Sequence, residues 1–593
     1  MKKSLSNPMI YRLYFDDPAH HLIRIEIDLP VRAEGDWEMV LSKWRPGRYE
    51  IAPYAENIVE VRAQTAAGAE VPLEKLAYNR WWVPHRPEAV TFTYKYYANV
   101  GNAGSSWFTE SFVYFNGVNF FMYCEGHFED ACEVHLDLPD NYRIACGLPQ
   151  DGTVLMAENF HQLVDAPLIA SATLQHDTVR VSGVIHHLWF QGETSPNWSQ
   201  IKSDFLRFGE AQTAMFGGFP VSEYHYLFIV HNKHFYHGVE HYNSTAIALG
   251  PGYRLMQPEL YEELLGVSCH ELFHTWNVKA IRPADMQPYD YDRENYSQLH
   301  YVTEGVTTYY GDLMLLKSGV WDLETYLRVF NNSVLKRHYN DNGRDHVSLE
   351  QASYDSWLVG YKSGVPNRKI SFYTKGALAA FILDYLIRKG SENARSLDTV
   401  LREMYARFGK PGPDGIRRGY TREDYKSIAE AHAGHDLDEY FSEVISGTAP
   451  LEERLQQAAR YFGLEMKRRS THTGYGKFLG FRLEASGTAA IVKQVHENSP
   501  ADRAGLHPGD EIIALNGLRV NSGNLTSVYR HFMLRQQHEL HIFRHERLQK
   551  LQLIPGGSPT PAYMLTPGRH PSREQLRNLM AWIKIEGYRD PEA

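Results

Sequence analysis

The sequence predicts a multidomain α+β protein: an N-terminal β-sandwich-like domain, a mainly α-helical middle domain and a small C-terminal β domain. Three observations predict this class. Apolar residues alternate with polar ones from about residue 10 to 170, recur at helical spacing from about 195 to 460, and then return to short strand-like runs. The chain of 593 residues is too long for one hydrophobic core. We expect domains at 1–175, 176–462 and 463–556, then a linker and C-terminal helix at 557–593.

The clearest strand is HLIRIEIDLP, where Ile23, Ile25 and Ile27 alternate with charged residues, and TFTYKYYA and CEVHLDLP repeat the pattern. The clearest helix is PELYEELLGVSCHELFHTWN, which begins at Pro258, a residue suited to a first helical turn. Further helices are predicted in TEGVTTYYGDLMLLKSG, ETYLRVFNNSVLKRHY, TKGALAAFILDYLIRKG and LDTVLREMYARFG. The polar segment from Asn340 to Ile370 is predicted to be a long, functional loop.

The composition excludes several classes of protein. The net charge of −10 and the lack of a long Lys/Arg run argue against a nucleic-acid partner. No apolar stretch reaches membrane-spanning length and the N-terminus lacks a signal-peptide core, which predicts a cytoplasmic protein with no membrane partner. The four cysteines are few and irregularly spaced, so we expect reduced thiols rather than disulfides.

The helix that begins at Pro258 carries a candidate metal site in its middle. Residues four apart project from one face of a helix, so His270 and His274 could bind one Zn²⁺, with Glu271 beside it as a general base for an attacking water. The alternative is an ordinary helix in a chain with 29 histidines. A catalytic zinc needs a third protein ligand. Glu304, which opens the next predicted helix, is the candidate, although its carboxylate could instead serve only as a capping charge.

Three segments, HELFHTWNVKAIRP, TEGVTTYY and SFYTKGALAAFILD, resemble the glycyl aminopeptidases, PDZ-bearing relatives of the aminopeptidase N clan of gluzincin metallopeptidases. KWRPGRYEIAPYAENI (43–58) is similar to the N-terminal β domain of that family. The resemblance implies a thermolysin-like catalytic domain with one Zn²⁺ per chain on His270, His274 and Glu304. Thr308 is a weaker candidate for supporting a ligand. Ala280 departs from the resemblance, because a second basic residue is expected there.

The resemblance also assigns roles around the metal. Tyr373 would donate a hydrogen bond to the oxyanion, Glu240 would anchor the free α-amine of a peptide, and Gly238 would let the substrate approach the backbone. The implied activity is a zinc aminopeptidase that acts on peptides with a free N-terminus and prefers small residues, Gly above Ala. The alternatives are a zinc endopeptidase and an inactive scaffold that binds peptides.

Residues 477–517, KFLGFRLEASGTAAIVKQVHENSPADRAGLHPGDEIIALNG, resemble a PDZ domain. Phe478, Leu479, Gly480 and Phe481 match its carboxylate-binding loop, which would receive the C-terminus of a peptide ligand. An equal alternative is that this module only packs against the catalytic domain.

Overall fold

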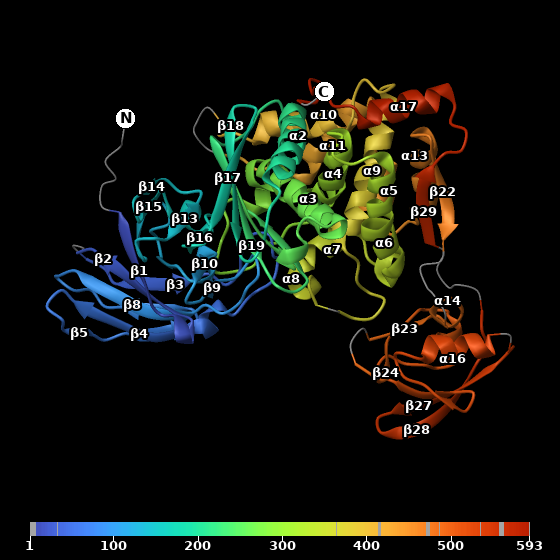
Figure 1. Ribbon diagram of the computed structural model, residues 1–593, viewed down its shortest axis with the longest axis horizontal. Helices are drawn as coiled ribbons and strands as arrows, with labels where there is room; N and C mark the ends of the chain where they lie inside the picture. The colour runs from blue at the N-terminus through green and yellow to red at the C-terminus, as the bar shows by residue number, and fades with distance from the viewer. Residues whose placement is uncertain are drawn as a thin grey trace.

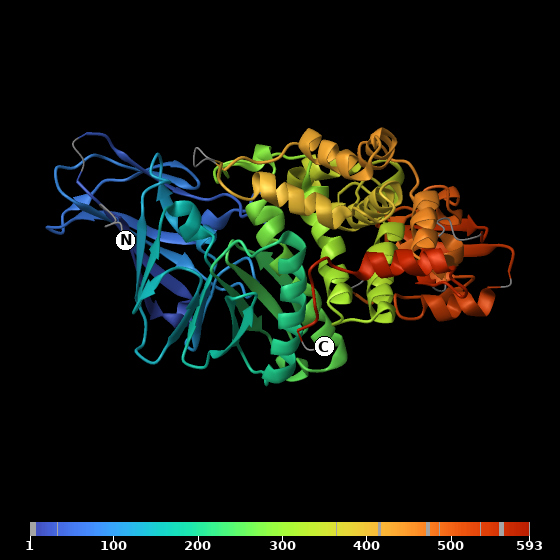
Figure 2. The ribbon, with the colours of Figure 1, turned by 90° about the horizontal axis from the view of Figure 1, so that it is seen from above.

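The computed structural model describes residues 8–31, 34–362, 364–412, 417–469, 475–484, 487–533, 535–556 and 562–591. Three parts lie in a row: a β-rich N-terminal domain at one end, a largely helical domain in the centre and a small β domain at the other end (Figures 1 and 2). The predicted multidomain α+β class is therefore confirmed.

The N-terminal domain is built from three sheets. The largest has eight strands, in the order β14 (Gln150–Asp151), β15 (Val154–Ala157), β12 (Cys132–Asp137), β1 (Met9–Asp17), β2 (Leu22–Leu29), β8 (Val90–Tyr97), β4 (Ile58–Thr65) and β5 (Glu70–Val71). The other two have four strands each: β13 (Arg143–Cys146), β16 (Leu168–Ser171), β10 (Phe112–Phe115) and β9 (Trp107–Phe108); and β11 (Met122–Cys124), β3 (Trp37–Leu41), β7 (Arg80–Val83) and β6 (Glu74–Ala77). A short helix, α1 (Phe160–Val164), follows β15.

The alternation seen in the sequence of β2 sets which face of the sheet is buried. Ile23, Ile25 and Ile27 have no exposed surface, and the charged residues between them are half-buried. Successive side chains of a strand point to opposite faces, so the apolar set faces the core. This core is continuous with that of the central domain, so the two domains pack firmly together.

The central domain begins with a five-stranded sheet that the sequence interpretation missed. Its order is β17 (Gln175–Val181), β18 (Val184–Gln191), β19 (Glu223–Val230), β21 (Ser244–Gly250) and β20 (Phe235–Glu240), which places β20 at an edge. β19 and β21 are buried on both faces. Such strands are apolar throughout and lack the period of two by which half-buried strands are found. Two helices accompany the sheet, α2 (Trp198–Phe216) and α3 (Pro258–Phe273), and α3 packs on β20 and β21.

The rest of the central domain is helical, as predicted. Its helices are α4 (Thr307–Lys317), α5 (Leu323–Phe330), α6 (Lys336–Asn340), α7 (Leu349–Tyr354), α8 (Ser356–Val359), α9 (Phe372–Gly390), α10 (Leu397–Phe408), α11 (Arg422–Ala433), α12 (Asp438–Tyr440) and α13 (Glu452–Tyr461). The expected long loop before α9 contains α7 and α8 and is therefore partly helical. None of the helices described here is long and apolar enough to cross a bilayer.

The C-terminal module lies between two strands that pair with each other, β22 (Leu464–Arg469) and β29 (Ala562–Pro567). Its own sheet contains β23 (Phe481–Leu483), β24 (Ala490–Val495), β25 (Glu511–Leu515), β27 (His538–Arg544) and β28 (Arg547–Leu553), with β26 (Leu518–Arg519) paired to β25. Its helices are α14 (Tyr475–Leu479), α15 (Pro500–Arg503) and α16 (Leu525–Phe532). The module has a separate hydrophobic core. The last helix, α17 (Arg573–Ile583), returns to the central domain, where Trp582 donates a hydrogen bond to Tyr309.

The C-terminal module docks on the segment between α6 and α9. Asn367 donates a hydrogen bond to the carbonyl oxygen of Val495 at 3.0 Å. Glu497 pairs with Arg368 at 2.6 Å and lies 2.9 Å from the ring of His346. The module is thus attached by polar contacts to the part of the central domain that leads into α9.

Candidate metal and active site

The paired histidines lie at the C-terminal end of α3, whereas the sequence predicted that they lie mid-helix. Helix α3 ends at Phe273 and His274 is its C-cap. Asn277, three residues on, leaves the helical conformation with φ −108° and ψ 84°. This departure brings the carbonyl oxygen of Asn277 within 2.8 Å of Nδ1 of His274. A hydrogen bond there leaves Nε2 of His274 free to bind a metal.

The three predicted ligands lie together. Nε2 of His270 is 3.1 Å from Nε2 of His274, which is 3.4 Å from Oε2 of Glu304. All three ligand atoms lie within 4.8 Å of one another. Tetrahedral zinc with bonds of about 2.0–2.1 Å places its ligands about 3.3 Å apart, so the spacing of the donors suits that ion.

Glu304 is held by groups from both sides of the domain boundary. It lies in the π-helical turn Tyr301–Val306 that leads into α4. Tyr49 of the N-terminal domain donates a hydrogen bond to its Oε1 at 3.1 Å. Thr307, one helical position away from the predicted Thr308, bonds to Asn277 and so links α4 to the His274 support. Tyr49 lies in the segment 43–58 that resembles the N-terminal β domain of the family, but nothing in the sequence pointed to its contact with Glu304, 255 positions away.

Glu271 is buried next to the metal ligands and faces β20. A Cβ on Gly238 would overlap the Oε1 atom of Glu271, so the strand can lie this close only because residue 238 is a glycine. Burial raises the pKa of Glu271 to about 8; the carboxylates of Glu240 and Glu304 add to the rise, and the charge of His274 opposes it. Among the described residues, Oε2 of Glu271 has no hydrogen-bond partner.

Glu240 ends the edge strand β20 and is only 4% exposed. Its Oε1 has no hydrogen-bond partner within the part of the chain that the structure describes. A Cβ on Gly47, which also has φ of +76°, would overlap the Glu240 carboxylate. The N-terminal domain therefore closes over Glu240. Three buried carboxylates, two of them with an unbonded oxygen, and two imidazoles form a donor set that fits a divalent cation.

Tyr373 lies in the first turn of α9, whose N-cap Ser371 accepts a hydrogen bond from the backbone N–H of Thr374. Its hydroxyl is 3.3 Å from that of Tyr361. Burial, and then the charge of Glu304, raise the pKa of Tyr373 well above its ordinary value, so its proton stays in place as a hydrogen-bond donor. Tyr361, from the segment after α8, is a neighbour that the sequence interpretation did not name.

The departure at Ala280 has a structural reason. Ala280 is 1% exposed and lies in the core, where a second charged residue would be buried. Its neighbour Lys279 pairs with Asp165 of the N-terminal domain at 2.8 Å, and His241 lies 3.2 Å from the same carboxylate oxygen. The positive charge of buried Lys279 thus already balances the negative charge of Asp165.

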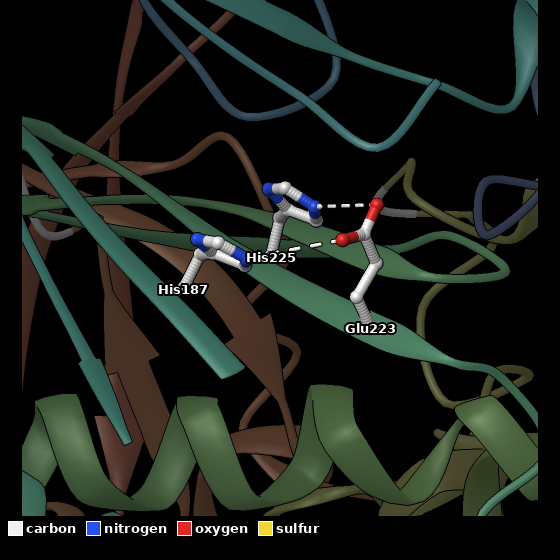
Figure 3. Close-up of side chains that lie close together, drawn as sticks. All are labelled: His187, Glu223 and His225. Atoms are coloured by element: carbon white, nitrogen blue, oxygen red, sulfur yellow. Dashed lines mark ion pairs between the residues drawn. The ribbon is translucent and has the colours of Figure 1, made fainter. Parts of the chain in front are cut away.

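A second group of potential metal ligands lies on the central sheet: His187 on β18, with Glu223 and His225 on β19 (Figure 3). Nε2 of His225 is 3.6 Å and Nε2 of His187 is 3.9 Å from the Glu223 carboxylate. The indole N–H of Trp189 donates to Nδ1 of His225 at 3.3 Å. The ring proton of neutral His225 therefore sits on Nε2 and occupies the position that a metal needs. Both ring nitrogens lie too far from the Glu223 carboxylate for a hydrogen bond, and the tautomer of His225 does not suit a metal site.

The predicted carboxylate-binding loop of the C-terminal module is the end of the short helix α14. Leu479 and Phe481 have no exposed surface and belong to the core of the module, and Phe478 packs against it. The carbonyl oxygen of Phe478 accepts a hydrogen bond from the N–H of Gly556, and that of Gly480 accepts one from the N–H of His496. Two backbone carbonyls of the loop are therefore already used inside the module.

Comparison with known families matches three segments of the chain. Residues 10–172 match the Peptidase M61 N-terminal domain, 263–379 match M61 glycyl aminopeptidase, and 477–554 match the PDZ domain. A search of curated proteins found no match.

Solved structures that are similar to this chain include an aminopeptidase N family protein from Idiomarina loihiensis. It is 25% identical, with a TM-score of 0.86 over 97% of this chain and 100% of that one. An M1 zinc metallopeptidase from Deinococcus radiodurans is 14% identical, with a TM-score of 0.45 over 75% of this chain and 95% of its own.

The fold and the cluster of His270, His274 and Glu304 define the class of the protein, a metallo-aminopeptidase. The family matches follow the order of the domains along the chain. The chain carries an M61 N-terminal domain, an M61 glycyl aminopeptidase domain and a PDZ domain, as its resemblance indicated.

Proposed function

We propose that the protein is a zinc-dependent aminopeptidase that removes a small N-terminal residue, Gly before Ala, from peptides and binds one Zn²⁺ per chain. The observation that carries this proposal is the cluster of His270, His274 and Glu304 within 4.8 Å of one another, with Glu271 and Glu240 buried beside it. Two imidazoles and a carboxylate are a common ligand set for catalytic zinc and leave a fourth position open.

When bound, Zn²⁺ supplies a Lewis acid that polarises the scissile carbonyl and lowers the pKa of water. Glu271 takes the proton of the attacking water and passes it to the leaving amine. The hydroxyl of Tyr373 donates a hydrogen bond to the oxygen that gains negative charge.

Glu240 selects the free N-terminus. Its carboxylate is buried, has an oxygen without a partner among the described residues, and lies at the end of the edge strand β20. A peptide that runs along this edge would place its ammonium group against that oxygen. An internal peptide bond carries no such charge, so this contact favours an exopeptidase.

Hydrolysis of glycyl-, alanyl- and leucyl-arylamides by the zinc-loaded protein tests the proposal. We expect the rate to fall in that order and to vanish for N-acetylglycyl-arylamide. Equal cleavage of N-terminally blocked peptides would identify an endopeptidase instead, and inactivity of the zinc-loaded protein on all substrates would favour a binding scaffold.

Replacing Tyr373 with Phe is expected to lower kcat by about 10²–10³-fold with little change in KM, because one donor to the oxyanion is lost. Steady-state kinetics on a glycyl-arylamide measure this. Tyr361→Phe is the matched control and should cost less than about tenfold, because the proposal assigns Tyr361 no contact with the reacting oxygen. A larger loss of kcat in Tyr361→Phe would indicate that Tyr361, and not Tyr373, donates the hydrogen bond to the oxyanion.

Replacing Glu240 with Gln is expected to lower the preference for a free over an acetylated N-terminus by about 10–100-fold, because the charge that pairs with the ammonium is lost. The ratio of kcat/KM for the two substrates measures the preference. Glu223→Gln, on β19, which β21 separates from β20, should leave the ratio unchanged. An unchanged ratio in Glu240→Gln would refute the amine anchor.

For the PDZ domain, the ligand we propose is a peptide with a free C-terminus. β23 lies at one of the two edges of its sheet in the described residues, and such an edge can accept an added peptide strand. Titration of the full chain with C-terminal peptides and with their amides would separate ligand binding from simple packing against the central domain.

A further inference from the structure

Arg45 is a buried cation at the edge of the active site. It is 4% exposed, and the described residues place no carboxylate within ion-pair distance of its guanidinium. Its partners are two neutral acceptors: the carbonyl oxygen of Pro46 at 3.1 Å and Nε2 of His237 at 3.4 Å. Burial of an arginine without an anion is costly, so this guanidinium is suited to receive one.

Arg45 belongs to a segment that lies along the active site. Within five residues of the chain, Arg45 contacts His237, Gly47 lies against the Glu240 carboxylate, and Tyr49 bonds to Glu304. Gly104 leaves room for the guanidinium, because a Cβ there would overlap it.

The distance along β20 between the contact of Arg45 and Glu240, the proposed partner of the substrate's amine, can be compared with the length of a short peptide. His237 and Glu240 are three residues apart on this strand, which corresponds to about 10 Å at about 3.3 Å per residue. An extended dipeptide or tripeptide spans about 7–10 Å between its amine and its carboxylate. Residues three apart on a strand point to opposite faces, so Arg45 would be reached at the edge of β20 and not along one face. A short peptide that lies along this edge with its amine at Glu240 would bring its C-terminal carboxylate level with His237, whose ring Arg45 contacts.

We propose that Arg45 binds the C-terminal carboxylate of the substrate, so that the enzyme is specialised for dipeptides and tripeptides. The inference rests on the proposed aminopeptidase function and adds the substrate class. An arginine fork matches a carboxylate in two parallel hydrogen bonds, and two of its current bonds are to weak neutral acceptors that a carboxylate can replace. The competing explanation is that Arg45 only balances the charge of the three glutamates.

The test compares glycyl-alanine with glycyl-alaninamide, which differ only in the terminal carboxylate, and uses a glycyl-arylamide as a substrate without one. For the wild type we expect kcat/KM to be about 10–100-fold higher for the acid than for the amide, mainly through KM. In Arg45→Gln this ratio should fall to about one. Arg45→Lys should keep part of it, because the charge remains without the planar fork.

Arg48→Gln is the matched control, since Arg48 lies in the same segment but pairs with Glu50, and it should keep the wild-type ratio. Thermal unfolding of each variant shows that it is folded. Two results would overturn the inference: equal hydrolysis of acid and amide by the wild type, or an Arg45→Gln variant that lowers kcat/KM for both substrates by the same factor. In either case, cleavage of the arylamide would still support the aminopeptidase function. Failure of the wild type to cleave the arylamide would overturn both.

Discussion

Replacing Glu271 with Gln is expected to lower kcat for a glycyl-arylamide by about 10³-fold, because the amide cannot take the proton of the attacking water. The side chains have nearly the same shape, so Gly238 still fits against residue 271. Glu271 lies outside the His270, His274 and Glu304 cluster, although its carboxylate is also close to His274 and Glu240. The proposal assigns it no bond to zinc, so the variant should bind zinc as tightly as the wild type. Steady-state kinetics together with metal analysis of the purified variant measure both quantities.

Glu263→Gln is the control for this substitution, since Glu263 lies on the same helix, two turns before Glu271, and is half-buried. It should keep activity within about twofold, as expected for a site away from the chemistry. Activity of Glu271→Gln close to that of the wild type would contradict its role as general base. Loss of zinc from that variant would show that Glu271 acts on the metal instead.

Replacing His274 with Ala is expected to abolish both zinc binding and hydrolysis. His274 is central to the cluster, because its Nε2 lies 3.1 Å from His270 and 3.4 Å from Glu304. With one of three ligands removed, the remaining pair cannot complete a catalytic zinc site. Metal analysis after dialysis should give about one zinc per chain for the wild type and for the exposed control His435→Ala, and almost none for His274→Ala. Retained zinc and activity in His274→Ala would place the metal elsewhere.

The protonation of His274 predicts how the affinity for zinc depends on pH. Burial alone would lower the pKa of His274, but Glu304, Glu240 and Glu271 raise it to about 10 in the metal-free protein. His274 therefore carries a proton at pH 7 that zinc must displace. Because each bound ion then releases that proton, affinity should rise at least about tenfold per pH unit between pH 6 and 8. Calorimetric titration in buffers of different ionisation enthalpy measures the release, and a pH-independent affinity would contradict it.

The chemistry around the metal was predictable where it depends on local geometry. His270 and His274 are four residues apart, and Glu271 follows the first, so a single helix presents all three. The exact end of that helix was not predictable, because it depends on the hydrogen bond of His274 to Asn277. Which residues share one face of a helix follows from their spacing in the sequence. The residue at which the helix ends is set by its tertiary contacts.

Residues from distant segments could not be predicted to meet. Tyr49 reaches Glu304 from another domain, and Tyr361 reaches Tyr373 from a segment that the sequence assigned only as a loop. The central sheet escaped notice for a related reason, because β19 and β21 are covered on both faces and show no alternation. The β-rich N-terminal domain was evident, since strands such as β2 have one buried face.

The pairing of β22 with β29 determines how the PDZ domain is attached. Arg469, the last residue of β22, lies opposite Ala562, the first residue of β29, so the chain leaves the catalytic body and comes back at neighbouring points. Modules whose two ends are close together are readily inserted into or exchanged within a host domain. The PDZ domain is thus inserted between two paired strands. It can be exchanged for another domain whose ends are close together while the hydrogen bonds between β22 and β29 are kept.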